Sequence, residues 1–280
     1  MKTLVILIFI ASCLLASNNQ DKYVIISFDD GFYSVYKYAY PILKHYRIPI
    51  TCGLVTSYIT NNAPKERSEY SFMSVNEIQE LIDSLNIEIA SHSVNHYDLT
   101  KLPVEQVKYE LIRSKRILDS VFNQNVITFI YPYGKTNPQI VELTKLAGYK
   151  LARSTKWGEP NLWVDRYLIP IKEIRTTTTI DEIIRHINNH RVTVLLFHRL
   201  STKPRYFTEY PPKQFAELIK LLSGDNRIKF LTLKELYNQW WCDFIKKYLH
   251  HKGWLTEYNS YLFQKIDIDQ TRTMYPSISQ

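Results

Sequence analysis

Residues 23–31 read YVIISFDDG, a short apolar run from Tyr23 to Phe28 that leads directly into two aspartates and a glycine. An uninterrupted apolar run of this length is typical of a strand that is buried on both faces, as in a parallel sheet. Further along the chain, Val192–Phe197 (VTVLLF) shows the same pattern and is followed at once by His198. Both segments therefore predict buried strands that end at side chains able to carry chemistry.

Between and around these two runs, strand patterns alternate with helical ones. The other strand candidates are residues 51–55, 87–91, 126–131, 149–154 and 229–233, and the helical candidates are residues 35–46, 75–85, 103–122, 138–147, 180–189, 212–222 and 234–250. About seven strands separated by helices predict a single α/β domain with a parallel sheet, either a closed (β/α) barrel or an open doubly wound sheet. Residues 155–175 show neither pattern and are expected to be irregular.

Polar side chains gather directly after the predicted strands. Asp29 and Asp30 follow the first strand, His92 and His96 follow residues 87–91, and His198 follows Phe197. Pro132-Tyr133-Gly134 follow the run that ends at residue 131. Because ligand sites of parallel α/β sheets lie at the carboxyl ends of the strands, we expect these groups to converge on one face.

The residue types in this set are chemically compatible. Two histidines and one carboxylate, here His92, His96 and Asp30, can hold a divalent metal and leave positions open for water and substrate. Asp29 can then act as a general base, and His198 can protonate a leaving group.

Each piece taken alone has an ordinary structural explanation. An Asp-Asp-Gly sequence after a strand is often just a turn, and a His-x-x-x-His pair is more often on the surface than on a metal. His186 and His190 have the same spacing as His92 and His96. They lie on a helix that leads into a strand, so we expect His190 near the opposite end of the sheet, away from the site.

The same residues also resemble a known family, the polysaccharide deacetylases, also called the NodB-homology family or carbohydrate esterase family four. The resemblance extends from about Tyr23 to about Tyr237. Its motifs are matched in order by Ser27-Phe28-Asp29-Asp30-Gly31, His92-Ser93-Val94-Asn95-His96, Pro132-Tyr133-Gly134 and Leu195-Leu196-Phe197-His198.

The resemblance implies a distorted (β/α) barrel with fewer than eight strands and a set of site roles. Asp29 would be the catalytic base and His198 the general acid. Asp30, His92 and His96 would bind a divalent metal, zinc by preference. The backbone N–H of Tyr133 would help to bind the oxyanion, a role in which one donor changes the rate by about 10²–10³.

The sequence departs from the family at two motifs. The third motif often carries an arginine that steadies the base, but Ile130 stands at that position here. Arg153, Arg166 and Lys172 are the candidates to replace it. The fourth motif, usually an Asp-Trp element, has no clear match, and either Trp157 or Trp163 could line a sugar site or simply pack in a loop.

The N-terminus has the pattern of an export signal. Met1-Lys2-Thr3 precedes an apolar run, residues 4–16, which is too short to span a membrane but suits a signal peptide. We expect a signal over residues 1–17, with Cys13 either a lipidation site or part of an ordinary cleaved signal. The net charge of +8 includes no dense basic cluster of the nucleic-acid-binding type; it fits either attraction to an anionic cell envelope or simply a soluble protein with a high pI. We expect an exported protein that is secreted, periplasmic or attached to the cell envelope.

After the signal, a catalytic domain is expected over residues 21–240 and a C-terminal extension over residues 241–280. The remaining cysteines, Cys52 and Cys242, do not establish a disulfide from sequence alone. The functional hypothesis is removal of N-acetyl groups from an amino-sugar polymer, with the acetylated polysaccharide as the partner. Two alternatives stay open: an O-acetyl esterase that uses the same site, and an inactive glycan-binding envelope protein. The loops 57–71 and 155–175 are the expected carriers of polymer specificity.

Overall fold

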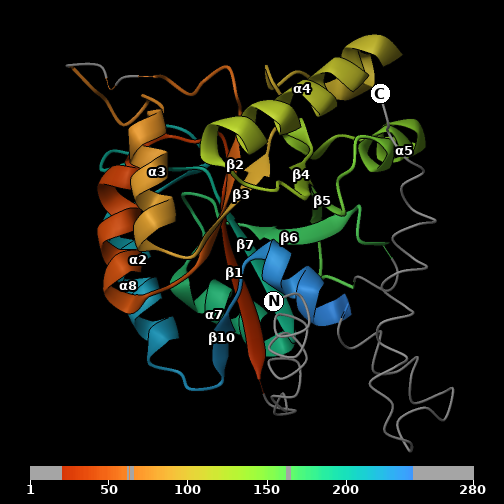
Figure 1. The fold of residues 1–280 in the computed structure, drawn as a ribbon. Helices are drawn as coiled ribbons and strands as arrows, with labels where there is room; N and C mark the ends of the chain where they lie inside the picture. The colour runs from red at the N-terminus through yellow and green to blue at the C-terminus, as the bar shows by residue number, and fades with distance from the viewer. Residues whose placement is uncertain (1–20, 62, 64–65, 162–164, 242–280) are drawn as a thin grey trace, which may run out of the picture. The chain divides into compact units, whose positions relative to one another are not determined.

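The computed structural model describes residues 21–61, 63, 66–161 and 165–241, and its centre is a ring of parallel strands (Figure 1). The ring runs in the order β1-β2-β3-β4-β5-β6-β7 and is closed by the pairing of β7 with β1. Its members are β1 (Lys22–Phe28), β2 (Ile50–Leu54), β3 (Ile87–Ser91), β4 (Thr128–Ile130), β5 (Leu151–Trp157), β6 (Ile169–Glu173) and β7 (Val192–Phe197). The closed alternative of the two predicted architectures is therefore the correct one.

β1 lies at the junction of the ring and pairs with three strands. β7 pairs with β1 along most of the length of β1, whereas β2 pairs only with the second half of β1, from Ile26 to Phe28. The first half is paired by β10 (Ile228–Phe230), which is also parallel. All the hydrogen-bonding edges of β1 are thus used, which explains why its seven residues are almost completely buried.

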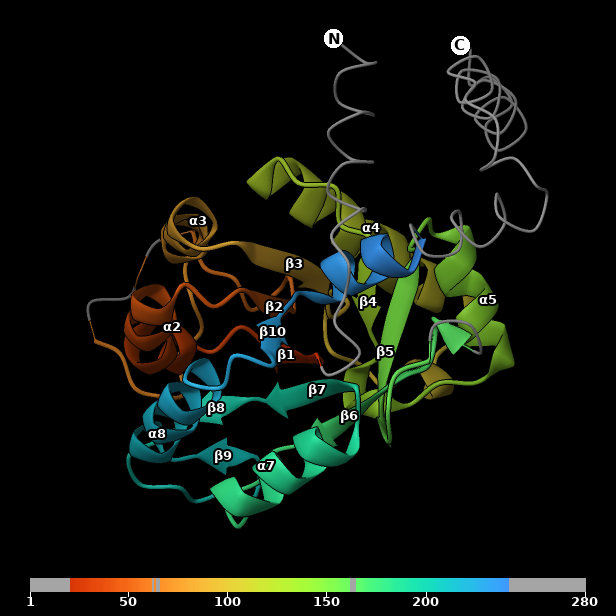
Figure 2. The same cartoon turned by 90° about the horizontal axis from the view of Figure 1, so that it is seen from below.

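Helices lie outside the ring of strands (Figures 1 and 2). They are α2 (Tyr40–Tyr46), preceded by the short π-helix η1 (Val35–Ala39), and α3 (Val75–Ser84), α4 (Val104–Phe122), α5 (Pro138–Leu146), α7 (Ile180–Asn189) and α8 (Pro212–Ser223). α7 begins with a capping box between Thr179 and Glu182, and α5 begins with the Asn137 side chain accepting from the Ile140 N–H. Each helix buries one apolar stripe against the strands.

One predicted irregular segment is in fact a barrel strand. β6 lies inside the stretch 155–175, and its sequence, IPIKE, has no continuous apolar run. Pro170 and the partial exposure of every second residue interrupt the apolar pattern, so hydrophobicity along the sequence does not reveal β6 as a strand. Conversely, the last predicted strand, residues 229–233, corresponds to β10, which pairs only with β1 and does not belong to the ring.

The described residues up to Asn238 belong to one compact unit, and residues 239–241 are grouped with a second unit. The signal segment with Cys13, Trp163, Cys242 and the predicted helix beyond residue 241 lie outside the described residues, so the predictions made for them stay predictions. Cys52 is a free thiol buried in β2. Within the described part of the chain, no helix is long and apolar enough to cross a membrane.

Candidate active site

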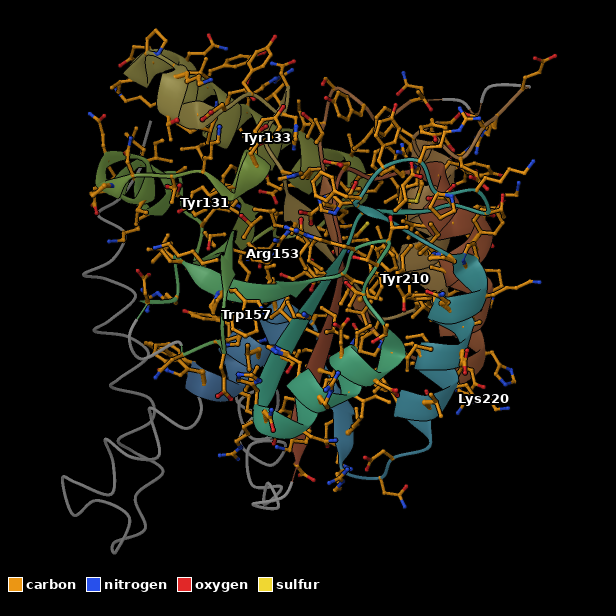
Figure 3. The ribbon with its side chains drawn as sticks, turned by 180° about the vertical axis from the view of Figure 1, so that it is seen from behind. Tyr131, Tyr133, Arg153, Trp157, Tyr210 and Lys220 are labelled. Carbon is orange, nitrogen blue, oxygen red and sulfur yellow. The ribbon has the colours of Figure 1, made fainter. Side chains whose placement is uncertain are left out.

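The predicted polar residues meet at the carboxyl end of the barrel. The Asp29 N–H donates to the Phe197 carbonyl oxygen at 3.0 Å, which places the end of β1 beside the end of β7 and His198. The His92 N–H donates to the Leu54 oxygen at 2.9 Å, so the residues after β3 lie beside the end of β2. Tyr133 lies near one end of the barrel and Arg153 lies in its interior (Figure 3).

Asp30, His92 and His96 form a compact group of ligand atoms. Asp30 Oδ1 lies 3.5 Å from His92 Nε2 and 3.4 Å from His96 Nε2, and the two Nε2 atoms are 3.1 Å apart. Among the described residues, this is the single set of three histidine, cysteine or carboxylate side chains close enough to share a cation. It is also the ligand set that the sequence predicts.

The bonding of these side chains suits a divalent metal. His92 Nδ1 is 2.8 Å from the Ile130 carbonyl oxygen, so Nδ1 carries the proton and the lone pair of Nε2 points into the group. Asp30 Oδ1 is buried and has no hydrogen-bond partner within the described part of the chain, although a buried carboxylate oxygen without one is costly. The Nε2 lone pair of His92, the Nε2 atom of His96 and this carboxylate oxygen face one another, an arrangement that fits a bound cation.

Burial sets the protonation of the three ligands. Burial lowers the pKa of His92 to about 3 and also lowers the pKa of His96, so both imidazoles are neutral at pH 7, as metal ligation requires. Burial and the neighbouring Asp29 carboxylate raise the pKa of Asp30 to about 7. A divalent cation in the group would offset that repulsion.

The backbone around the group is held in unusual conformations. Asp30, Ser93, His96 and Tyr133 all have φ between 57° and 72°, the left-handed region that residues with a Cβ rarely adopt. Such strain persists only where surrounding contacts enforce it, and it is concentrated at functional sites. Four such residues at one end of the barrel therefore mark that end as the site.

Glu110, on the inner face of α4, enforces the loop that carries the two histidines. One of its carboxylate oxygens accepts from the Val94 and Asn95 N–H groups at 2.8 and 2.9 Å, and the other accepts from Asn95 Nδ2 at 2.7 Å. Glu110 is completely buried. The sequence analysis did not assign it a role, although a carboxylate between Val107 and Leu111 on the apolar face of a helix is a detectable signal.

Arg153 replaces the arginine that is missing at position 130. It is fully buried on β5, and its Nη2 lies 2.5 Å from both carboxylate oxygens of Asp29. The Ile130 side chain carries no charge that could pair with Asp29, and its Cδ1 packs so closely against Gly53 of β2 that a Cβ there would clash with it. The candidate Arg153 is therefore confirmed as the partner of Asp29.

This ion pair keeps Asp29 ionised inside the protein. Burial alone would raise the pKa of Asp29, but the positive charge of Arg153, with His92 and His198, outweighs it and lowers the pKa below its ordinary value. His198 in turn has its pKa lowered by burial, against the opposing effect of Asp29. His198 Nδ1 is buried and has no hydrogen-bond partner among the residues that the structure describes.

Tyr133 forms the rim of the site on the side of β4. It lies in the short 3-10 turn η3 (Pro132–Gly134), with its ring 4.6 Å from that of His96 and 57% of its surface exposed. The next residue must be glycine, because a Cβ at Gly134 would collide with the Thr155 side chain and because its φ is +66°. The turn that presents the Tyr133 backbone is thus fixed by packing against β5.

The other predicted candidates lie elsewhere. Lys172 lies 6.0 Å from the ring of Trp157, which packs at 5.6 Å against His186 of α7, and Figure 3 shows Trp157 well separated from Tyr133. Arg166 lies over the Tyr167 ring, 5.3 Å from its centre. Lys22, at the start of β1, donates to the His190 carbonyl oxygen, which confirms that His190 lies near the amino end of the strands.

Comparison with known proteins gives consistent matches. Residues 16–152 match the family described as "Polysaccharide deacetylase". The poly-beta-1,6-N-acetyl-D-glucosamine N-deacetylase of Staphylococcus aureus is 28% identical over 133 residues, which are 45% of this chain and 45% of that protein. The enzyme of the same name from Escherichia coli K12 is 26% identical over 176 residues, 50% of this chain and 26% of its own length.

A solved structure, Streptococcus pyogenes deacetylase PplD in complex with acetate, superposes with a TM-score of 0.52 at 25% identity. The superposition covers 57% of this chain and 68% of PplD. This chain spans half or less of the length of the curated relatives that it matches.

Proposed function

Residues 16–152 place this chain in the polysaccharide deacetylase family, and from that premise we propose that it hydrolyses N-acetyl groups of an N-acetylglucosamine-containing polysaccharide and releases acetate. The amide substrate is favoured by the two relatives named poly-beta-1,6-N-acetyl-D-glucosamine N-deacetylase. The observation that carries the proposal is the placement of the ionised Asp29–Arg153 pair directly beside the Asp30, His92 and His96 group.

Asp30, His92 and His96 would hold the metal, for which we propose Zn²⁺ because two neutral imidazoles and one carboxylate are typical zinc ligands. When bound there, the ion would polarise the acetyl carbonyl and make a water molecule more acidic. The side chains on either side of the group then divide the proton transfers between them.

Asp29 is the proposed base. Its carboxylate, which Arg153 holds in place and keeps ionised, accepts a proton from the attacking water. The Tyr133 backbone N–H donates to the oxygen that becomes negative in the tetrahedral intermediate. In its protonated form, His198, next to Asp29 at the end of β7, gives a proton to the departing sugar amine. Arg153 acts through Asp29 in this scheme and is therefore a positioning residue.

We also propose that the protein acts outside the cytoplasm, at or near the cell envelope. Support comes from the apolar segment after Lys2, the polar residues that follow it, and the net charge of +8. Fractionation of cells and mass spectrometry of the mature N-terminus test this proposal. Lipidation at Cys13 would give a membrane-associated product with an acylated cysteine, whereas a full-length N-terminus in the cytosol would contradict export.

The function is tested by acetate release from N-acetylglucosamine oligomers. The purified protein is stripped with a chelator, resupplied with zinc and assayed beside Asp29→Asn, which should bind zinc without turnover. Zinc-dependent release that Asp29→Asn lacks supports the proposal. Release from O-acetylated xylan oligomers alone would show an esterase instead, and no release from either substrate by the zinc-loaded protein would indicate an inactive glycan-binding protein.

A further inference from the structure

A row of aromatic rings leads away from the metal-ligand group. The Tyr58 ring lies 6.5 Å from that of His96 and stacks on Phe72 at 4.4 Å, and Phe72 stacks on Phe32 at 5.1 Å. The Arg199 guanidinium, one residue after His198, continues the row, 4.7 Å from Phe32 and 3.8 Å from Tyr70. We call Phe32, Tyr58, Tyr70, Phe72 and Tyr206 the aromatic wall.

The outer end of the wall is exposed. Tyr206 meets Tyr70 edge-on at 6.3 Å and lies 5.6 Å from Arg199. The exposed fractions are 37% for Tyr70 and 58% for Tyr206. Neighbouring exposed rings on a soluble domain leave apolar surface in water, and such patches generally mark places where a ligand docks.

Buried charges hold these exposed rings in position. Glu209 is completely buried in β9 (Glu209–Tyr210), and its Oε1 accepts from Nε of Arg199, in β8 (Arg199–Leu200), at 3.0 Å. Its Oε2 accepts from the Arg205 N–H at 2.5 Å and the Tyr206 N–H at 3.3 Å. One carboxylate thus fixes both the cation beneath the rings and the backbone that carries Tyr206.

A second carboxylate ties together the two loops that supply the rings. Glu69, next to Tyr70, accepts from Ser201 Oγ at 2.7 Å and from the N–H and Oγ1 of Thr202 at 3.1 and 2.8 Å. Tyr38 donates to the same carboxylate at 2.9 Å. Rings that are pre-positioned in this way lose little conformational entropy when a ligand stacks on them.

We infer that Tyr70 and Tyr206 form an accessory sugar subsite that stacks a pyranose ring of the substrate polymer, away from the sugar whose acetyl group is removed. The C–H face of a pyranose is apolar and matches an aromatic ring, and the row of rings, joined through Arg199, leads from Tyr70 to His96 and so toward the reacting centre. This inference rests on the proposed function and specifies how the same site selects its substrate.

The experiment compares Tyr206→Ala and Tyr70→Ala with the unmodified protein on oligomers of increasing length. We expect kcat/KM on the longest oligomers to fall about five- to tenfold, mainly through KM, with a much smaller change on the shortest one. Tyr206→Trp should restore the long-chain preference. Tyr109→Ala removes an exposed tyrosine of α4 and is the matched control, expected to leave every length unaffected. Equal losses at all lengths, or none, would overturn the subsite.

A binding measurement separates this inference from the proposed function. Calorimetric titration of the same oligomers into zinc-loaded Asp29→Asn, with and without Tyr206→Ala, needs no turnover. Weaker binding of the double variant to long oligomers supports the subsite even if the unmodified protein proves inactive. Identical binding of both proteins, or no carbohydrate binding by either, would overturn it, and thermal melting of each variant verifies that it is folded.

Discussion

Two histidine pairs with the same spacing have opposite surroundings in this protein. His92 and His96 follow β3, bring their Nε2 atoms to 3.1 Å and face the unpartnered Asp30 oxygen. His186 and His190 lie at the C-terminal end of α7, with their ring centres 4.1 Å apart. His190 Nδ1 is 2.7 Å from the His186 carbonyl oxygen, an ordinary hydrogen bond at a helix end. Spacing alone therefore does not make a ligand pair. His92 and His96 are distinguished by their position at the carboxyl end of the strands and by the nearby Asp30 as a third candidate ligand.

The largest expected effect comes from removing one histidine of each pair. Under the proposed function, His92→Ala should lose bound zinc and at least about a thousandfold in activity, because the ion would supply several kcal/mol of transition-state stabilisation. His186→Ala should keep stoichiometric metal and near-normal activity. Metal content by atomic emission and acetate release measure both. A His186→Ala protein without metal, or a fully metalated His92→Ala, would remove the distinction between the pairs.

A smaller loss of activity is expected from replacing Arg153, the cation that pairs with Asp29 beside His92 and His96. Arg153→Met should lower activity about 10–100-fold, because Asp29 loses the partner that orients it and keeps it ionised. It should also destabilise the fold by about 3–5 kcal/mol, since a buried carboxylate is left unpaired. Lys172→Met, beside Trp157 and near the second pair, is the control and should change little. A shifted pH–rate profile in Arg153→Met, with zinc still bound, would identify the effect as electrostatic.

The role of Glu110 in supporting the loop that carries His92 and His96 can be tested separately. Glu110→Gln keeps the volume of the side chain but weakens its hold on the Val94 and Asn95 N–H groups. We expect zinc affinity to fall about tenfold, measured by competition with a chelator. Glu182→Gln, in the capping box of the helix that carries His186, should reduce stability without changing zinc affinity. Equal zinc affinities for Glu110→Gln and the unmodified protein would contradict a supporting role.

The smallest effect concerns protonation of the second pair. Burial, together with His190 and Lys172 and against the opposing effect of Glu159, lowers the pKa of His186 to about 4. In the unfolded chain the pKa of His186 is near 6.5, so the unfolded chain binds a proton at this imidazole more readily than the folded chain does. The folded state therefore loses stability as the pH falls from 6.5 to 4. His186→Gln should remove that dependence, so its Tm should fall by a few degrees less than that of the unmodified protein between pH 7 and 5. Parallel Tm curves would contradict it.

The strands and their reactive ends were predictable because their signals are local. The run from Tyr23 to Phe28 and the run ending at Phe197 are continuous apolar segments, and the side chains after them meet as expected. β6 was missed because three of its five residues are partly exposed and Pro170 interrupts its apolar pattern. A strand of this kind forms because it pairs with its neighbours β5 and β7. The sequence pattern of one segment carries no information about that pairing.

The partners of the site residues were harder to predict for a related reason. Arg153 and Asp29 are 124 residues apart and meet only across the barrel interior, so the sequence could name Arg153 as one of three candidates but could not choose among them. Glu110 carried a detectable signal, a carboxylate on an apolar helix face. The aromatic wall carried none, because its rings come from loops whose course is set by Glu69 and Glu209.

The origin of Arg153 on β5 has a consequence for how activity arises during folding. In the ring order, β5 is separated from β1 by three strands on one side and by two on the other, so its guanidinium reaches Asp29 only across a closed barrel. A chain in which the strands have formed but the ring is still open has every catalytic side chain and no oriented base. Recovery of turnover during refolding would therefore track ring closure, whereas recovery of helical signal would precede it.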